Sequence, residues 1–557
     1  MNEEPGPPGA PTETRRRSFW GWGYEDQALG PDRLSALAAL LAARFGGEPP
    51  DARQPVSLSD LELRPPRLEP PAPLAHLCDT STYERARHSY GRSFRDAVRG
   101  FRGEFPHPPD VVAYPATETD VTDILDWCAG AGAAAVPNGG GSSAVGGVEC
   151  DPGDGYRGVV TVDLTALDRV LEVDPTSRAA RIQGGALGPR LEDQLRPHGL
   201  SLRHFPQSFE FSTLGGWIAT RSGGHYATLF THIDDMVESL RVVTPRGVME
   251  TRRLPGSGAG PAPDRLFIGS EGTLGIITEA WMRVFERPRH RARAAVPFPS
   301  FQAGAEAARA LAQSGLYPSN CRLLDAAEAL MAGAGTTPVL LVGFESADHP
   351  LGPWMARALE CCADHGGVAP DVAGEEADAA TPGDRGDPVV DGDRGDPVVD
   401  AWRRSFLALP YLRDGLVALG AIVETFETAV TWDRFPALHE AVVAATTEAL
   451  DAIGARGGSV ACRFTHVYPD GPAPYFTVIA PGRGGAELDQ WAVLKEAASA
   501  AIAAHGGTIT HHHAVGRDHR RWYDAQRPDL FAEALRAAKH ALDPAGVLNP
   551  GVLIDSP

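Results

Sequence analysis

Three segments rich in glycine and small hydroxyl residues lie between residues 137 and 280, separated by patterns that indicate strands and helices. They are P-N-G-G-G-S-S at 137–143, Q-S-F-E-F-S-T-L-G-G-W-I-A-T-R-S-G-G at 207–224 and F-I-G-S-E-G-T-L-G-I-I-T-E-A at 267–280. Such polar backbone is costly to bury unless a ligand or another partner satisfies it. We therefore expect the three segments to form the walls of one extended groove that holds a dinucleotide.

The first segment has the chemistry of an anion-binding turn. Three consecutive glycines let the backbone turn tightly and lie flat against a ligand. Successive N–H groups in such a turn form a concavity for anions, to which Ser142 and Ser143 can add hydroxyl donors. The segment is neither the G-x-G-x-x-G fingerprint nor a P-loop, because no lysine follows it. The pyrophosphate of a dinucleotide suits this turn, and a purely structural turn is the alternative.

Composition excludes several classes of protein. The 51 basic residues against 72 acidic ones give a net charge of -21, which argues against nucleic acid as the main partner. The seven cysteines contain no C-x-x-C pair, which favours free thiols in a reducing compartment. The first residues lack the apolar core of a secretion signal, and no run of 18 apolar residues spans a membrane. We expect a cytoplasmic protein, with peripheral membrane contact left open.

The N-terminal part, residues 1–94, has two recognisable features. Residues 32–45 have the pattern of an amphipathic helix with an acidic start. Residues 19–24, F-W-G-W-G-Y, form an aromatic patch that is either a packing anchor or part of an apolar substrate channel.

A second region follows the glycine-rich one and alternates helices with strands. It contains an exact tandem repeat, G-D-R-G-D-P-V-V-D, at 383–391 and 392–400. The repeat is typical of a duplication in a surface loop, so we expect residues 383–400 to form a loop.

Three adjacent histidines, His511, His512 and His513, follow a glycine-rich turn. On a strand, His511 and His513 would share one face and His512 would lie on the other. Histidine titrates near neutrality, which suits proton transfer beside a redox cofactor, and a buried structural pair is the alternative. A metal site would need further ligands, and none has suitable local spacing, so we expect no metal.

Three further side chains are candidates with open alternatives. Tyr475, in P-D-G-P-A-P-Y-F-T-V, follows a turn on a short strand, where an isolated tyrosine is more often a packing residue. Arg322 and Arg413 lie in apolar surroundings, where an arginine usually has a fixed anionic partner. That partner is either a substrate phosphate or the carboxylate of a structural salt bridge.

Together these motifs resemble the FAD-binding enzymes of the vanillyl-alcohol oxidase superfamily and, within it, the alkylglycerone-phosphate synthase (alkyl-dihydroxyacetonephosphate synthase) family. The specific likeness rests on the triple histidine, F-S-T-L-G-G-W-I-A-T-R, W-D-R, Y-L-R-D and the aromatic patch. The resemblance implies an α+β fold with a two-subdomain FAD-binding domain at 95–285. It also implies an α/β cap domain built on an antiparallel sheet at 286–540 and a C-terminal return to the FAD domain at 541–557.

The resemblance also implies roles for single residues. Tyr475 would be the acid/base, and His511 to His513 would form the catalytic cluster. Arg413 would hold the substrate phosphate, Arg322 would line the same cavity and Thr425 would supply a hydroxyl. The residues that would contact FAD are Pro137, Asn138, Gly139, Gly140, Gly141, Ser142, Ser143, Gln207, Ser208, Phe209, Glu210, Phe211, Ser212, Thr213, Thr220, Arg221, Ser222, Gly223, Glu271, Gly272, Thr273, Leu274, Gly275, Ile276 and Ile277. We expect the FAD to be bound non-covalently, because no histidine lies at an evident flavin-linking position in the glycine loop. His225 is the one candidate for a covalent link.

The implied reaction is a redox-neutral exchange, in which a fatty alcohol replaces the fatty acid of acyl-dihydroxyacetone phosphate. It needs a general base, a phosphate clamp and a long apolar tunnel. The expected partner is thus a lipid-like phosphorylated small molecule, and a homodimer is left open. The alternatives are an FAD-linked D-2-hydroxyacid oxidase or dehydrogenase, which N-P-G-V-L-I near the end resembles, and a non-catalytic protein that kept the fold.

Overall fold

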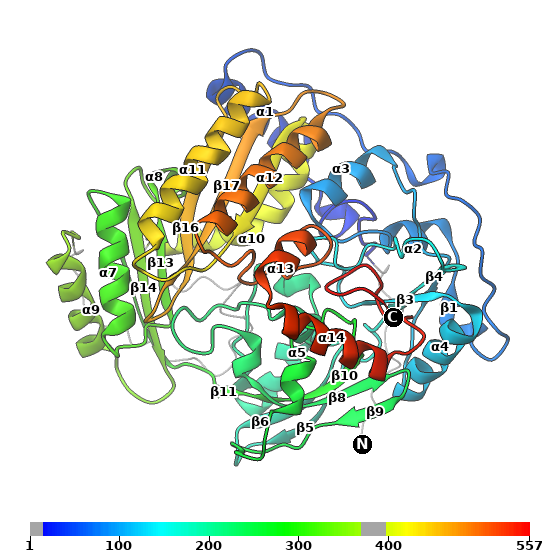
Figure 1. The fold of residues 1–557 in the computed structure, drawn as a ribbon. Coiled ribbons are helices and arrows are strands. Elements are labelled where there is room, and N and C mark those ends of the chain that lie inside the picture. Colours follow the sequence, from blue (N-terminus) through cyan, green and yellow to red (C-terminus); the bar gives the residue numbers. More distant parts are fainter. Residues whose placement is uncertain (1–14, 369–396, 557) are drawn as a thin grey trace, which may run out of the picture.

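The computed structural model describes residues 15–368 and 397–556, except for a few side chains near the start of one helix. Residues 1–14, 369–396 and 557 lie outside the described residues. They include the start of the predicted N-terminal extension and most of the tandem repeat. Figure 1 shows three main sheets with helices packed on them.

The first sheet has four strands in the order β1-β2-β4-β3, with β2 and β3 parallel to β4. The strands are β1 (Cys78–Asp79), β2 (Val111–Ala113), β3 (Ala134–Asn138) and β4 (Val159–Asp163). Helix α4 (Glu118–Ala131) connects β2 to β3, and it begins where the Thr117 hydroxyl accepts a hydrogen bond from the Asp120 N–H at 3.2 Å. The crossover places the glycine loop 139–143 directly after the buried strand β3.

The second sheet is antiparallel, in the order β5-β6-β10-β8-β9. Its strands are β5 (Val170–Asp174), β6 (Ala179–Gln183), β10 (Ile276–Arg283), β8 (Val237–Thr244) and β9 (Gly247–Glu250). Helices α5 (Gly188–Leu195), α6 (Leu214–Thr220) and α14 (Asp529–Leu542) pack on its core (Figure 1). Val515 and Leu535 already lie in this core, so the chain returns to it earlier than the predicted boundary at 541.

The third sheet has six antiparallel strands in the order β12-β14-β13-β16-β17-β15. They are β12 (His290–Pro297), β14 (Val339–Ser346), β13 (Asn320–Leu324), β16 (Ser459–Val467), β17 (Pro472–Pro481) and β15 (Ala421–Glu427). Side chains alternate across it: Leu323 packs in the core with α7 (Phe301–Gln313) and α9 (Gly352–Asp364), whereas Leu324 packs with α8 (Ala326–Met331). Helices α11 (Phe435–Ala452) and α12 (Glu487–Ala504) pack in the same core as Leu323, α7 and α9 (Figure 1).

The N-terminal part packs onto both regions. Helix α1 (Pro31–Phe45) buries Ala38 and Leu41 against α10 (Pro397–Ala418). In the aromatic patch, the Trp20 ring lies 5.0 Å from that of Phe101, and the Trp22 ring lies 5.5 Å from that of Phe211. These contacts support the interpretation of the patch as a packing anchor.

The tandem repeat differs from the predicted loop at its end. Residues 397–400, the last four of the second copy, form the first turn of α10, and Val399 is buried against Leu341. Proline is well suited to the first turn of a helix, because its missing N–H is unpaired there in any case. The remainder of the repeat lies outside the described residues. Among the helices that are described, none combines the length and the apolar character needed to cross a membrane.

Candidate active site

The three glycine-rich segments lie in contact with one another. The loop 139–143 packs so closely on the second segment that a Cβ added to Gly140 would lie 1.6 Å from the Phe211 carbonyl oxygen. A Cβ on Gly139 would lie 2.1 Å from Thr213 Oγ1, so only glycine fits at both positions. Pro137 packs against Gly272 of the third segment. The structure therefore brings the predicted cofactor segments together.

The loop retains free hydrogen-bond donors. Within residues 15–368 and 397–556, the backbone N–H groups of Gly140, Gly141 and Ser142 donate to no protein acceptor, and the loop is half-buried. Consecutive unpaired N–H groups in a turn form an anion-binding concavity. These residues therefore fit the pyrophosphate of a dinucleotide such as FAD.

The hydroxyls of the second segment, by contrast, are used within the protein. Ser212 Oγ accepts from Ser208 Oγ at 3.0 Å and from Trp217 Nε1 at 2.6 Å. The Thr213 hydroxyl accepts from the Gly216 N–H at the start of α6. The backbone, rather than these hydroxyls, is what remains for a ligand.

Several other predicted contact residues have side chains directed to protein partners. Glu210 is exposed and accepts from the Tyr411 hydroxyl at 3.1 Å, and the exposed Arg221 donates to Asp234 at 3.1 Å. Gln207 donates to the Phe406 carbonyl oxygen. Thr220 donates to that of Gly216, and Thr273 donates to that of Ser270. Buried apolar side chains of the segments are Phe209, Phe211, Leu274, Ile276 and Ile277. The side chains of these residues are thus engaged within the protein.

The histidine triplet lies in a bend rather than on a strand, which corrects the predicted alternation of faces. The cause is Glu427 at the end of β15, whose carboxylate accepts from the N–H groups of His511, His512 and His513, the last at 2.9 Å. The Thr510 hydroxyl donates to the same carboxylate at 2.6 Å. Glu427 is only 1% exposed, and the histidines and hydrogen bonds hold its pKa far below the ordinary value despite burial. A side chain thus replaces the neighbouring strand as the acceptor of these N–H groups.

Tyr475 lies in the same cluster as the histidines. It is the cross-strand partner of Glu427, and its ring stacks on that of His512 with centroids 6.1 Å apart. The Arg463 guanidinium lies 4.0 Å from the centre of the Tyr475 ring. Burial raises the pKa of the Tyr475 hydroxyl, whereas Arg463 and a hydrogen bond with Thr425 act in the opposite direction. The structure therefore groups Tyr475 and Thr425 with the histidine triplet.

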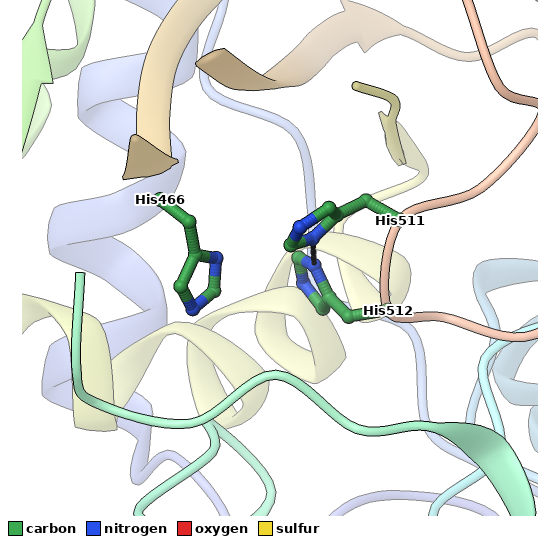
Figure 2. Close-up of side chains that lie close together, drawn as sticks. All are labelled: His466, His511 and His512. Atoms are coloured by element: carbon green, nitrogen blue, oxygen red, sulfur yellow. Dashed lines mark hydrogen bonds between the residues drawn. The ribbon is translucent and has the colours of Figure 1, made fainter. Parts of the chain in front are cut away.

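Other members of the cluster were not anticipated from the sequence. His511 Nε2 lies 2.7 Å from the Tyr468 hydroxyl and 3.1 Å from His232 Nε2. Figure 2 shows the His466 ring facing His511 and His512. His466 Nε2 donates to the Gly224 carbonyl at 3.1 Å. These partners come from separate parts of the chain, so no local pattern could reveal them.

The electrostatics of the cluster favour neutral imidazoles. Burial lowers the pKa of His512 to about 3 and lowers those of His466 and His511 well below the ordinary value. At neutral pH these rings are therefore unprotonated, and their free nitrogen lone pairs can accept a hydrogen bond or bind a cation. Ring nitrogens of His466, His511 and His512 lie within 4.8 Å of one another, a grouping that could hold a divalent transition metal. The expectation of no metal stays a prediction.

The two predicted phosphate-binding arginines differ in their surroundings. Arg322 is buried, its guanidinium lies 4.7 Å from the centre of the Trp402 ring, and it has no ion pair with any described residue. Burial and the nearby Arg463 lower its pKa to about 9. Arg413 instead pairs with Asp414 at 2.9 Å, and none of its described contacts is with Tyr475 or the histidines. Its surroundings are those of the alternative interpretation, a structural salt bridge.

A second buried carboxylate holds the other end of the histidine loop. Glu271, in the third glycine-rich segment, accepts from the N–H groups of Val515 at 2.9 Å and Gly516 at 2.8 Å. Burial raises its pKa to about 7 despite these hydrogen bonds. The loop 511–516 is therefore attached to the six-stranded sheet through Glu427 and to the glycine segments through Glu271.

We expect Glu271→Gln to reduce the pH dependence of stability. Because the folded-state pKa is raised from 4.5 to about 7, the folded protein retains a proton that the unfolded chain releases between these values. This bound proton stabilises the folded protein fully below the unfolded-state pKa. As the pH rises to the folded-state pKa, the free energy of unfolding therefore falls by about 3 kcal/mol. Urea-unfolding midpoints at about pH 5 and about pH 7.5 measure this effect. An equal shift in wild type and variant would contradict it.

Comparison with known proteins matches two family models to two successive parts of the chain. A family model described as "FAD binding domain" matches residues 109–252, and one described as "FAD linked oxidases, C-terminal domain" matches residues 287–553. The alkyldihydroxyacetonephosphate synthase of Trypanosoma brucei brucei is 30% identical over 481 residues, covering 85% of this chain and 78% of that protein. The enzyme of the same name from Dictyostelium discoideum is 31% identical over 478 residues, covering 84% and 77%.

A solved structure of an alkyldihydroxyacetonephosphate synthase has the same fold. It superposes with a TM-score of 0.76 at 24% identity and covers 96% of this chain and 98% of its own. The predicted α+β fold, an FAD-binding domain followed by a cap domain on an antiparallel sheet, is confirmed.

Proposed function

Because the chain belongs to the alkyldihydroxyacetonephosphate synthase family, we propose that it exchanges the acyl group of acyl-dihydroxyacetone phosphate for a fatty alcohol, with FAD as cofactor. The observation that carries the proposal is the cluster of the buried Tyr475 with three half-buried histidines beside a predicted flavin segment. A Cβ added to Gly223 of that segment would lie 3.2 Å from His512 Cβ and 2.9 Å from His466 Cε1. Proton-transfer groups thus lie against the wall of the cofactor groove.

The residues of the cluster have the properties that the exchange needs. His511 and His512 are neutral at rest, as a general base must be. The Glu427 carboxylate raises their pKa values against the effect of burial, and it would stabilise the imidazolium that forms when one of them takes a proton from the substrate carbon. The Tyr475 hydroxyl would deliver a proton to the departing oxygen, with Thr425 and Arg463 orienting it. When bound, FAD would supply an electron-accepting ring and undergo no net reduction.

The substrate phosphate needs positive charge in the same region. Arg322 has a buried guanidinium without an ion-pair partner among the described residues, which makes it available to an anion. Arg413, which the resemblance assigns to the phosphate, would have to share its guanidinium with Asp414. Peripheral membrane contact, a homodimer and a cytoplasmic location stay predictions from the sequence.

Incubation of the purified, FAD-loaded protein with acyl-dihydroxyacetone phosphate and a labelled fatty alcohol tests the proposal. We expect labelled alkyl-dihydroxyacetone phosphate and released fatty acid, with the visible absorbance of the flavin unchanged at the end. Absence of alkyl product from FAD-loaded protein would overturn the proposal. Bleaching of the flavin by a D-2-hydroxyacid alone would instead identify the alternative, an oxidase or dehydrogenase.

We also propose that the FAD is held without a covalent bond. The loop 139–143 contains no histidine, cysteine or tyrosine to which a flavin could be linked. Acid denaturation is expected to release all yellow colour into the supernatant, as measured by absorbance. Colour retained in the protein pellet would show a covalent link, and a His225→Ala variant would test that residue as its site.

A further inference from the structure

Four arginines gather around the glycine loop 139–143. Arg17 Nη2 donates to the Gly140 carbonyl at 3.5 Å. The backbone N–H of Arg92 donates to the Ser143 carbonyl at 2.6 Å, while its guanidinium donates to the neighbouring Gly91 and Ser18 carbonyls. Arg413 donates to the carbonyl of Arg92. Arg87 is close enough to lower the pKa values of both Arg17 and Arg92. Such a concentration of positive charge is unusual in a chain whose net charge is -21.

Two of these arginines have carboxylate partners and two do not. Arg87 pairs with Asp163 at 3.3 Å, and Arg413 pairs with Asp414 at 2.9 Å. Arg17 and Arg92 have no carboxylate within 4.0 Å among residues 15–368 and 397–556. Their guanidinium groups hydrogen-bond only to backbone carbonyls there, and both Nε atoms are buried without a partner.

Burial makes this lack of partners costly. Arg92 is only 5% exposed, and Arg17 is half-buried. A buried charge is normally paired, and Arg17, Arg413 and Arg87 repel Arg92 further. Anionic ligand oxygens would satisfy both the charge and the free N–H groups of the adjacent loop.

We propose that Arg17 and Arg92, together with the N–H groups of Gly140, Gly141 and Ser142, bind a phosphate-class anion, and that the N-terminal segment 15–24 closes this site. The inference rests on the proposed function, which supplies two such anions: the pyrophosphate of FAD and the phosphate of the substrate. Both share the chemistry of a compact, oxygen-rich anion that guanidinium groups and turn N–H groups recognise.

The N-terminal segment is anchored in a way that fixes Arg17 at the loop. The Arg17 guanidinium lies 4.0 Å from the centre of the Phe211 ring, and its carbonyl accepts from the Tyr83 hydroxyl at 2.8 Å. The carbonyl of Ser18 accepts from Arg92 Nη2 at 3.1 Å. Trp22 packs against the same Phe211 ring. The aromatic patch therefore does more than anchor the N-terminal segment, because it also positions the preceding Arg17 at the glycine loop.

The test compares Arg17→Gln with Arg33→Gln in the full-length protein. Arg33 is exposed on α1, outside segment 15–24, so its replacement removes the same charge away from the loop. FAD affinity is measured by flavin fluorescence during reconstitution of the apoprotein. Affinity for acyl-dihydroxyacetone phosphate is measured by calorimetry on the FAD-loaded protein. We expect Arg17→Gln to weaken one of these affinities by about tenfold or more, and Arg33→Gln to change neither.

The two measurements separate the sources of the anion. A loss of FAD affinity assigns the site to the pyrophosphate, and inorganic pyrophosphate should then compete with FAD in wild type. A loss confined to the substrate assigns it to the substrate phosphate. Equal values for Arg33→Gln and Arg17→Gln in both measurements would overturn the proposal.

Arg92 provides a second variant pair. Arg92→Lys keeps the charge and Arg92→Gln removes it, so we expect the lysine variant to recover part of the lost affinity. If the buried Arg92→Gln does not fold, as judged by its circular dichroism, the Arg17→Gln comparison still decides. Failure of the exchange assay in wild type would reject the proposed function, whereas a selective loss of FAD affinity would leave this site standing.

Discussion

Tyr475→Phe is expected to lower the rate of alkyl exchange by about 10²- to 10⁴-fold while leaving FAD bound. The substitution removes one hydroxyl from a buried ring that lies between His512 and Arg463, and it leaves the packing of that ring unchanged. The loss should appear in kcat rather than in KM, because the hydroxyl is proposed to act in the chemical step. Product formation and flavin absorbance, measured on the same preparation, check both parts.

Tyr156→Phe is a matched control for this experiment. The Tyr156 hydroxyl donates to the Gly546 carbonyl at 2.6 Å, and it has no described contact with the histidine cluster. We expect its kcat to stay within about twofold of wild type. A Tyr475→Phe enzyme with normal kcat would remove Tyr475 from the proposed chemistry.

Glu427→Gln is expected to reduce both activity and stability. The amide cannot accept from all three N–H groups of the triplet and the Thr510 hydroxyl, because its NH₂ group is a donor. It also removes the negative charge that would stabilise a protonated ring. We expect kcat to fall by about 10²-fold or more and the free energy of unfolding to fall by about 2–4 kcal/mol. Product assays and urea unfolding measure the two effects.

Glu424→Gln separates activity from stability in this test. Glu424 is a buried carboxylate on the same strand, β15, but its partners are Lys495 and Trp491 rather than the histidines. We expect it to lose stability while the folded fraction keeps a kcat close to that of wild type. If both variants lost kcat equally, general destabilisation would explain the result and Glu427 would have no specific role.

Local pattern was sufficient for much of the fold. The helix predicted at residues 32–45 from its amphipathic pattern and acidic start is α1, which the structure places at Pro31–Phe45. The contact between the glycine-rich segments was also predicted, because polar backbone of this kind needs a shared partner. The helix depends on residues close together in the sequence, and the contact follows from a composition that the three segments share, which is why a single sequence reveals both.

The features that could not be predicted depend on distant partners. Glu427 binds the histidine triplet from 84 residues away, and nothing near either segment marks this pairing. The expectation of a strand at the triplet was wrong because that carboxylate takes the place of a ladder of backbone acceptors. His232 and His466 likewise reach the cluster from other elements. The end of the tandem repeat was assigned to a loop from its composition, but burial of Val399 favours a helix there.

The attachment of one short loop to two buried carboxylates has a mechanical consequence. Residues 511–516 are too few to stretch, and their N–H groups are bound by Glu427 at one end and by Glu271 at the other. Separating the six-stranded sheet from the glycine-rich segments would therefore break at least one attachment and displace the imidazole rings. We accordingly expect the proposed lipid substrate to enter and leave without separation of these two parts.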